Sequence, residues 1–187
     1  MAEGWTDPVS LLFRYLLDER RRALFPRGAR VLEIGPAGGA VGETFDGAWA
    51  GPGALDGAEP RRLAGWLAVV LRPGAPLLLC VRNPRPLPAL LRRALTGTGD
   101  WRSRSAARAS DGAAPPSPRQ LREAFGPAFS WRGGFALGLF LPAPEESGWA
   151  AESPQLFGLL AAAEGLLRRR PVFRGLGAFA ALEGTRA

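Results

Sequence analysis

A glycine-rich turn follows a short apolar run near the start of the chain and is the clearest place for chemistry. The run Val31–Ile34 stops at Gly35, and further glycines stand at Gly38 and Gly39. Because glycine has no Cβ, a ligand can approach the backbone of such a turn closely. Glu33 adds a carboxylate that can accept hydrogen bonds from a cationic or hydroxylated ligand. The pattern indicates a ligand-binding turn, and it is equally open to a structural role in which Glu33 only caps the turn.

The amino acids that are missing exclude several kinds of site. The chain has 187 residues, which fits one domain, and it contains no histidine, no lysine and a single cysteine, Cys80. Histidine triads, histidine metal sites, lysine Schiff bases and cysteine clusters are therefore excluded, and we expect no bound metal. Acid–base chemistry is left to aspartate, glutamate, Tyr15 and Cys80. An enzyme limited to these side chains would depend on a cofactor for its chemistry.

The charge of the chain comes from arginine alone. All 24 basic residues are arginine, and the formal net charge is +7. No arginine cluster alternates with aromatic residues as a single-strand platform would, so nucleic-acid binding is not expected. No run reaches the roughly 18 apolar residues of a membrane span, and the N-terminal residues lack a signal-peptide pattern. We therefore expect a cytoplasmic protein that does not bind membranes.

Helices and strands are predicted to alternate along a single domain, residues 1–187. Proline marks most of the helix starts, after the cap residue Asp7 and within the capping box that begins at Ser117. The predicted helices cover residues 8–22, 60–72, 87–95, 118–125 and 154–167. The predicted strands cover residues 30–34, 45–50, 75–81, 135–141 and 176–182. Residues 103–116 are rich in small residues and are expected to form a mobile loop. This alternation predicts an α/β fold.

The residues around the glycine-rich turn resemble a known family. The segment Val31–Gly39 resembles motif I of class I S-adenosylmethionine-dependent methyltransferases, V-L-E/D-x-G-x-G-x-G. Residues 45–56 look like that fold's fourth strand and active-site loop, and residues 61–79 are similar to its next helix, L-R-P-G-G turn and fifth strand. The resemblance implies a shortened Rossmann-like methyltransferase sheet with helices on both faces and a C-terminal antiparallel strand pair. It also implies S-adenosylmethionine as cofactor and a small-molecule substrate.

The same resemblance implies roles for particular residues, while no catalytic residue is assigned. It implies a cofactor site formed by Glu33, Gly35, Ala37 and Gly39. It implies a substrate side, more weakly marked, formed by Asp46, Trp49 and Asp56. Glu33 would lie near the amino-acid end of the cofactor, and the glycines would let the backbone pass beside it.

The chain departs from the family pattern immediately after the turn. Five residues, Ala40–Thr44, separate Gly39 from Phe45, where the family has two more strands with their helices. The acidic residue that binds the ribose hydroxyls and the segment that contacts adenine have no counterpart, and Ala37 brings a Cβ into the turn. Each lost contact would cost about 1–3 kcal/mol of binding free energy. Binding of S-adenosylmethionine is therefore expected to be weak or lost.

The same shortening leaves the first strand at an edge of the predicted sheet. A second copy or a partner protein along Arg30–Ile34 would cover its free backbone groups. Two functional hypotheses stay open. One is a methyltransferase-like protein of the small-molecule type with a weakened cofactor site. The other is a non-catalytic or repurposed protein of the same fold: a partner subunit, a small-molecule binder, or a cofactor-independent cyclase or isomerase.

Overall fold

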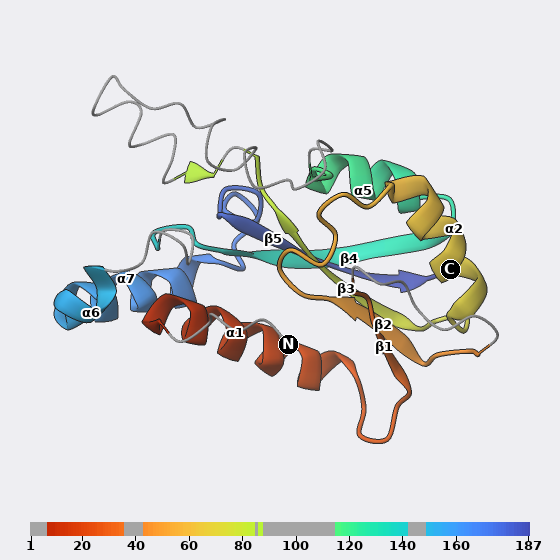
Figure 1. Cartoon of the computed structure of the whole chain (residues 1–187), viewed down its shortest axis with the longest axis horizontal. Helices are drawn as coiled ribbons and strands as arrows, with labels where there is room; N and C mark the ends of the chain where they lie inside the picture. Colours follow the sequence, from red (N-terminus) through yellow and green to blue (C-terminus); the bar gives the residue numbers. More distant parts are fainter. Residues whose placement is uncertain (1–6, 36–42, 85, 88–114, 142–148) are drawn as a thin grey trace.

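The centre of the structure is an open sheet of five strands (Figure 1), in the order β1-β2-β3-β5-β4. The computed structural model describes residues 7–35, 43–84, 86–87, 115–141 and 149–187. The strands are β1 (Val31–Glu33), β2 (Gly47–Ala50), β3 (Pro76–Arg82), β4 (Phe129–Leu137) and β5 (Phe179–Arg186). Strands β1, β2 and β3 are parallel, and β5 is antiparallel to both of its neighbours, β3 and β4. This order and these directions confirm the predicted shortened sheet with its late antiparallel pair.

Helices cover both faces of the sheet, as the sequence predicted. Figure 1 shows α1 along one side of the sheet and α2 and α5 on the other. The helices are α1 (Pro8–Leu24), α2 (Pro60–Val70), α5 (Pro118–Phe125), α6 (Trp149–Glu152) and α7 (Pro154–Leu167). None of the helices in the described part of the chain has the length and apolar character that a membrane crossing needs.

Two of the predicted helix starts are capped as expected. The Asp7 carboxylate accepts hydrogen bonds from the backbone N–H groups of Val9 and Ser10, both at 3.0 Å. At the start of α5, Ser117 and Gln120 form the reciprocal pair of a capping box, because each side chain accepts from the other residue's backbone N–H. These contacts satisfy N–H groups that the first turn of a helix leaves free, so they determine where the helices begin.

Strand β3 lies at the centre of the molecule and is buried on both faces. Leu77, Leu79 and Val81 pack into the core beneath α2 and α5, whereas Leu78 and Cys80 pack into the core beneath α1. All five side chains are at most 2% exposed. A continuous apolar run is what a parallel strand covered on both sides requires. The position of β3 confirms the prediction made from this run.

The ends of the two late strands differ from the prediction. Strand β4 covers Phe129–Leu137 instead of residues 135–141, because the chain turns at Gly138, where φ is +73°. Strand β5 covers Phe179–Arg186 instead of residues 176–182, and Thr185 and Arg186 pair with the start of β4. Long-range pairing sets both boundaries, so the local pattern of apolar residues did not reveal them.

The short helix α6 was not predicted. Most of the predicted third helix, from residue 88 onward, and most of the predicted loop, residues 103–114, lie outside the described residues.

Candidate functional site

The candidate site lies where the three parallel strands end. Because β1, β2 and β3 are parallel, their carboxyl ends meet at one edge of the sheet. Open α/β sheets bind ligands beyond the carboxyl ends of their strands. At this edge the chain presents Glu33 at the end of β1, the turn 51–58 after β2, and Asn83 directly after β3.

Glu33 extends from the last position of β1 and is exposed. Within the described residues its carboxylate has no hydrogen bond and no ion pair. No atom of a non-adjacent described residue lies within 4 Å of the position that a Cβ on Gly35 would occupy. Ala37 and Gly39, the other two predicted cofactor residues, lie outside the described part of the chain.

Trp49 lies opposite Glu33 in the register of β1 and β2, so the two side chains share one face of the sheet. The ring is half-buried against α1, and the guanidinium carbon of Arg21 lies 4.9 Å from its centroid. On its other side, a Cβ on Gly51 would lie 3.4 Å from the ring. Trp49 is thus close to Glu33, and it is already packed between a cation and the backbone.

The turn after β2 carries Asp56 and is built on two glycines with positive φ. Gly53 and Gly57 both have φ of +80°, a conformation that favours glycine because other residues would be strained. Leu55 is 2% exposed and anchors the turn in the core beneath α2. Asp56 itself is exposed in this turn.

Asp46 lies at the amino end of β2, at the opposite edge of the sheet from Glu33. Its carboxylate accepts a hydrogen bond from the backbone N–H of Arg30 at 3.0 Å and pairs with the Arg72 guanidinium at 2.5 Å. These contacts join the residue before β1 to the turn before β3. The structure therefore places Glu33, Gly35 and Trp49 at the carboxyl ends of β1 and β2 and Asp56 in the turn after β2, whereas Asp46 lies at the opposite edge.

A groove of about 720 Å³ adjoins the carboxyl end of β3, and the sequence did not point to it. Asn83, Pro84 and Gly175 contribute to its lining. The residues from α5 and its cap that line the groove are Ser117, Pro118, Arg119, Arg122 and Glu123. The groove is open to solvent, and polar and charged side chains provide much of its lining.

Asn83 determines the shape of this groove. Its side-chain amide donates hydrogen bonds to the carbonyl groups of Gly175 and Gly177, at 2.7 and 2.9 Å. These bonds hold the segment before β5 against the end of β3. A polar residue two positions after the buried run Leu77–Val81 was the one sequence signal that could have indicated this edge.

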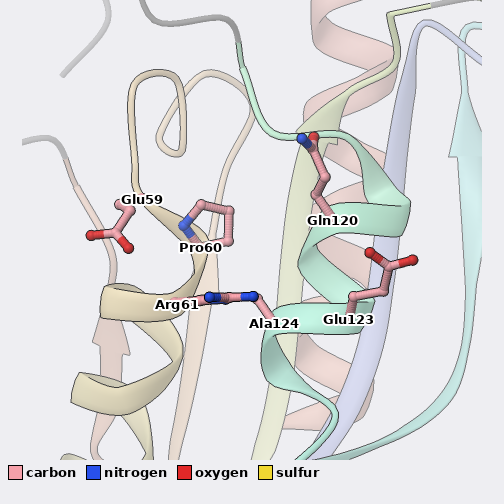
Figure 2. A pocket seen from close by; sticks show the side chains of 6 residues that line it. All are labelled: Glu59, Pro60, Arg61, Gln120, Glu123 and Ala124. Atoms are coloured by element: carbon pink, nitrogen blue, oxygen red, sulfur yellow. The ribbon is translucent and has the colours of Figure 1, made fainter.

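A smaller hollow of about 280 Å³ lies between the first turn of α2 and one side of α5. Figure 2 shows Glu59, Pro60 and Arg61 on the side of α2, and Gln120, Glu123 and Ala124 on the side of α5. Glu59 precedes α2 without a side-chain cap hydrogen bond. Glu123 lines this hollow as well as the larger groove, so the two spaces are neighbours along α5.

Two other acid–base candidates from the sequence, Tyr15 and Cys80, do not belong to this site. Tyr15 is 64% exposed on α1. Cys80 is fully buried in β3, and burial raises the pKa of its thiol because the thiolate would lose its hydration. No group of three or more cysteine or acidic side chains suited to a metal ion occurs among the described residues.

Comparison with known proteins adds little to this geometry. No family model and no curated protein sequence matches the chain. Among solved structures, the chain is similar to the [4+2]-cyclase SpnF, with 20% sequence identity and a TM-score of 0.41. The match covers 76% of this chain and 50% of the cyclase chain, so this protein spans about half the length of that one. A likeness at this level of identity and TM-score says nothing about activity.

Proposed function

We propose that the chain is a class I S-adenosylmethionine-dependent methyltransferase-like protein of the small-molecule type, with a weakened cofactor site. One observation carries the proposal. The Glu33 carboxylate is exposed at the carboxyl end of β1, no described residue partners it, and no non-adjacent described residue fills the space beside Gly35. An unpaired carboxylate at this edge suits a cationic ligand group.

The described residues fit one end of this cofactor. Glu33 and Gly35 would hold its amino-acid end, by charge and by close backbone approach. S-adenosylmethionine supplies an activated methyl group when bound. Strand β1 ends the sheet, and within the described residues no strand lies on its outer side to provide a ribose contact. Methyl transfer depends mainly on proximity and alignment, so a chain without histidine and lysine can support it when the acceptor is already nucleophilic.

Calorimetry with S-adenosylmethionine and S-adenosylhomocysteine tests the proposal. We expect a dissociation constant of roughly 100 μM or weaker, about −5.5 kcal/mol, because the ribose and adenine contacts are missing. Glu33→Gln should abolish binding and shift the melting temperature little, since the carboxylate has no partner in the described structure. Glu152→Gln, which neutralises an exposed carboxylate in α6, is the matched control and should bind like the wild type.

Two results would contradict the proposal. A nanomolar affinity would show that the chain rebuilds the missing contacts elsewhere. A large loss of thermal stability in Glu33→Gln, with no binding by the wild type, would assign Glu33 to a structural cap.

The groove at the end of β3 supports the second candidate, a repurposed protein that binds a small molecule without the cofactor. This space of about 720 Å³ is lined without any contribution from Glu33. A binder, a partner subunit, or a cofactor-independent cyclase or isomerase could therefore use it on its own. Absence of S-adenosylmethionine binding in a folded wild-type chain favours this candidate over the first.

A further inference from the structure

Helix α7 buries its charged side chain and exposes several leucines, which is the opposite of an ordinary surface helix. Its only charged side chain, Glu164, is 0% exposed, whereas Leu156, Leu159 and Leu166 are 48%, 68% and 77% exposed. A surface helix usually turns its apolar stripe toward the core and its charges toward water. Here the apolar stripe faces outward.

Three exposed leucines and the half-buried Ala163 have the spacing of a helix–helix seam. Leu156, Leu159, Ala163 and Leu166 follow one another at intervals of three, four and three residues. This is the spacing of the a and d positions of a coiled coil, where side chains from one helix fit between those of another. The 14 residues of α7 provide two such repeats over about 21 Å.

Buried hydrogen bonds prevent the helix from turning this seam inward. The Glu164 carboxylate accepts hydrogen bonds from the backbone N–H groups of Gly138, Leu139 and Phe140, at 2.7, 2.8 and 3.2 Å. Rotating α7 to bury its leucines would expose this carboxylate and leave three N–H groups without an acceptor. Unpaired buried polar groups are costly, so the outward direction of the leucines is a stable property of the fold.

The charges at the two ends of α7 are of opposite sign. Glu152 precedes the helix and Arg170 follows it, and both are exposed. Arg169 is also exposed, but its guanidinium lies 3.8 Å from the Glu19 carboxylate of the same chain and pairs with it. A parallel pairing of two such helices would bring the arginines of both copies together. An antiparallel pairing would place the arginines of each copy beside Glu152 of the other. The end charges thus complement those of a second, inverted copy.

We propose that the outer face of α7 is an interface between two copies of this chain, packed antiparallel about a two-fold axis. The seam Leu156, Leu159, Ala163 and Leu166 would form its apolar centre, with the Glu152–arginine pairs at each end. A two-fold axis uses the same patch on both copies, which a seam with opposite charges at its ends allows. This surface is separate from the edge of β1, where the sequence had suggested association.

The contact would be modest in size. One helix face of two repeats buries less than the roughly 800 Å² per partner of a standard interface. We therefore expect a reversible dimer with a dissociation constant on the order of 10–100 μM, corresponding to a weak complex.

Sedimentation equilibrium over a range of concentrations tests this interface. The wild-type chain should show a monomer–dimer equilibrium. The double variant Leu159→Glu/Leu166→Glu should weaken association at least about tenfold, because it places four carboxylates in the centre of the contact. Val69→Glu is the matched control, since Val69 is 78% exposed on α2, away from α7, and this variant should associate like the wild type. Circular dichroism of all variants establishes that they are folded.

A charge exchange tests the antiparallel direction. Glu152→Arg should weaken the dimer, and adding Arg170→Glu to it should restore wild-type association. A wild-type chain that stays monomeric to about 1 mM would overturn the proposal, as would a dimer that survives the leucine changes; the latter would point to the edge of β1. A monomer that cosediments with phosphatidylserine vesicles would assign the seam to an anionic lipid surface instead.

Discussion

Cys80 shows how position in the fold decides the chemistry of a single residue. The thiol lies in the middle of β3 and is fully buried, and burial raises its pKa because the thiolate is poorly solvated there. Thiol reagents react with the thiolate, so native protein should be labelled only as fast as it unfolds. Ellman's reagent should detect no thiol in the native state and one per chain in guanidinium chloride. Rapid labelling of the native protein would contradict this burial.

Glu164 is the second residue whose surroundings dictate its behaviour. Three backbone N–H groups donate to its carboxylate, and Arg168 lies nearby, yet desolvation dominates and raises its pKa. Glu164→Gln should lower the free energy of unfolding by about 1–3 kcal/mol, because the amide cannot accept all three hydrogen bonds. Urea unfolding near pH 5 would measure this loss.

The pH dependence of this substitution has a definite sign. Because the folded pKa of Glu164 is raised, the folded state binds its proton more tightly than the unfolded chain does. The stability advantage of the wild type over Glu164→Gln should be fully present below about pH 4.3, the ordinary glutamate pKa, and should fall as the pH rises through the raised value. An advantage that grows with pH would mean that the N–H donors outweigh desolvation.

Close packing of β5 against β4 leaves no room for a side chain at Gly134. Gly134 in β4 has φ of +149°, and a Cβ there would overlap the carbonyl oxygen of Ala181 in β5. Gly134→Ala should therefore lower the free energy of unfolding by about 3 kcal/mol or more, through strain and overpacking.

Gly65→Ala is the matched control for this change. Gly65 lies in the interior of α2, and nothing stands within 4 Å of its Cβ position. This variant should raise the free energy of unfolding by roughly 0.5–1 kcal/mol, because alanine favours helix. Equal effects of the two substitutions in urea unfolding would contradict the close packing of β4 on β5.

Ligand binding should be visible as a change in the stability of the whole molecule. With a dissociation constant of about 100 μM, 1 mM S-adenosylmethionine should stabilise the folded state by about 1.4 kcal/mol. For a chain of 187 residues this corresponds to a rise in melting temperature of roughly 3–6 °C. Differential scanning fluorimetry should show this rise for the wild type and none for Glu33→Gln. A rise well above 10 °C would show that the site is not weakened.

Local signals in the sequence were enough to predict most of the elements. The cap at Asp7, the capping box at Ser117 and the apolar run of β3 act through neighbouring residues, so they can be recognised without the fold. The resemblance to the methyltransferase family supplied the strand order, which pattern alone would not give. The placement of Glu33 at the carboxyl end of β1 follows from the same local reasoning.

Only the tertiary structure decided the features that depend on distant partners. The bounds of β4 and β5 come from pairing across the sheet, and Asp46 pairs with Arg72 at the edge opposite Glu33. Asn83 lines the groove and donates hydrogen bonds to Gly175 and Gly177, in the segment before β5 and more than 90 residues away in sequence. The leucines of α7 face outward because the Glu164 carboxylate accepts hydrogen bonds from backbone N–H groups that lie 24 to 26 residues earlier in the chain. Such contacts join residues far apart in sequence, and their free energies outweigh the local preferences from which a sequence pattern is interpreted.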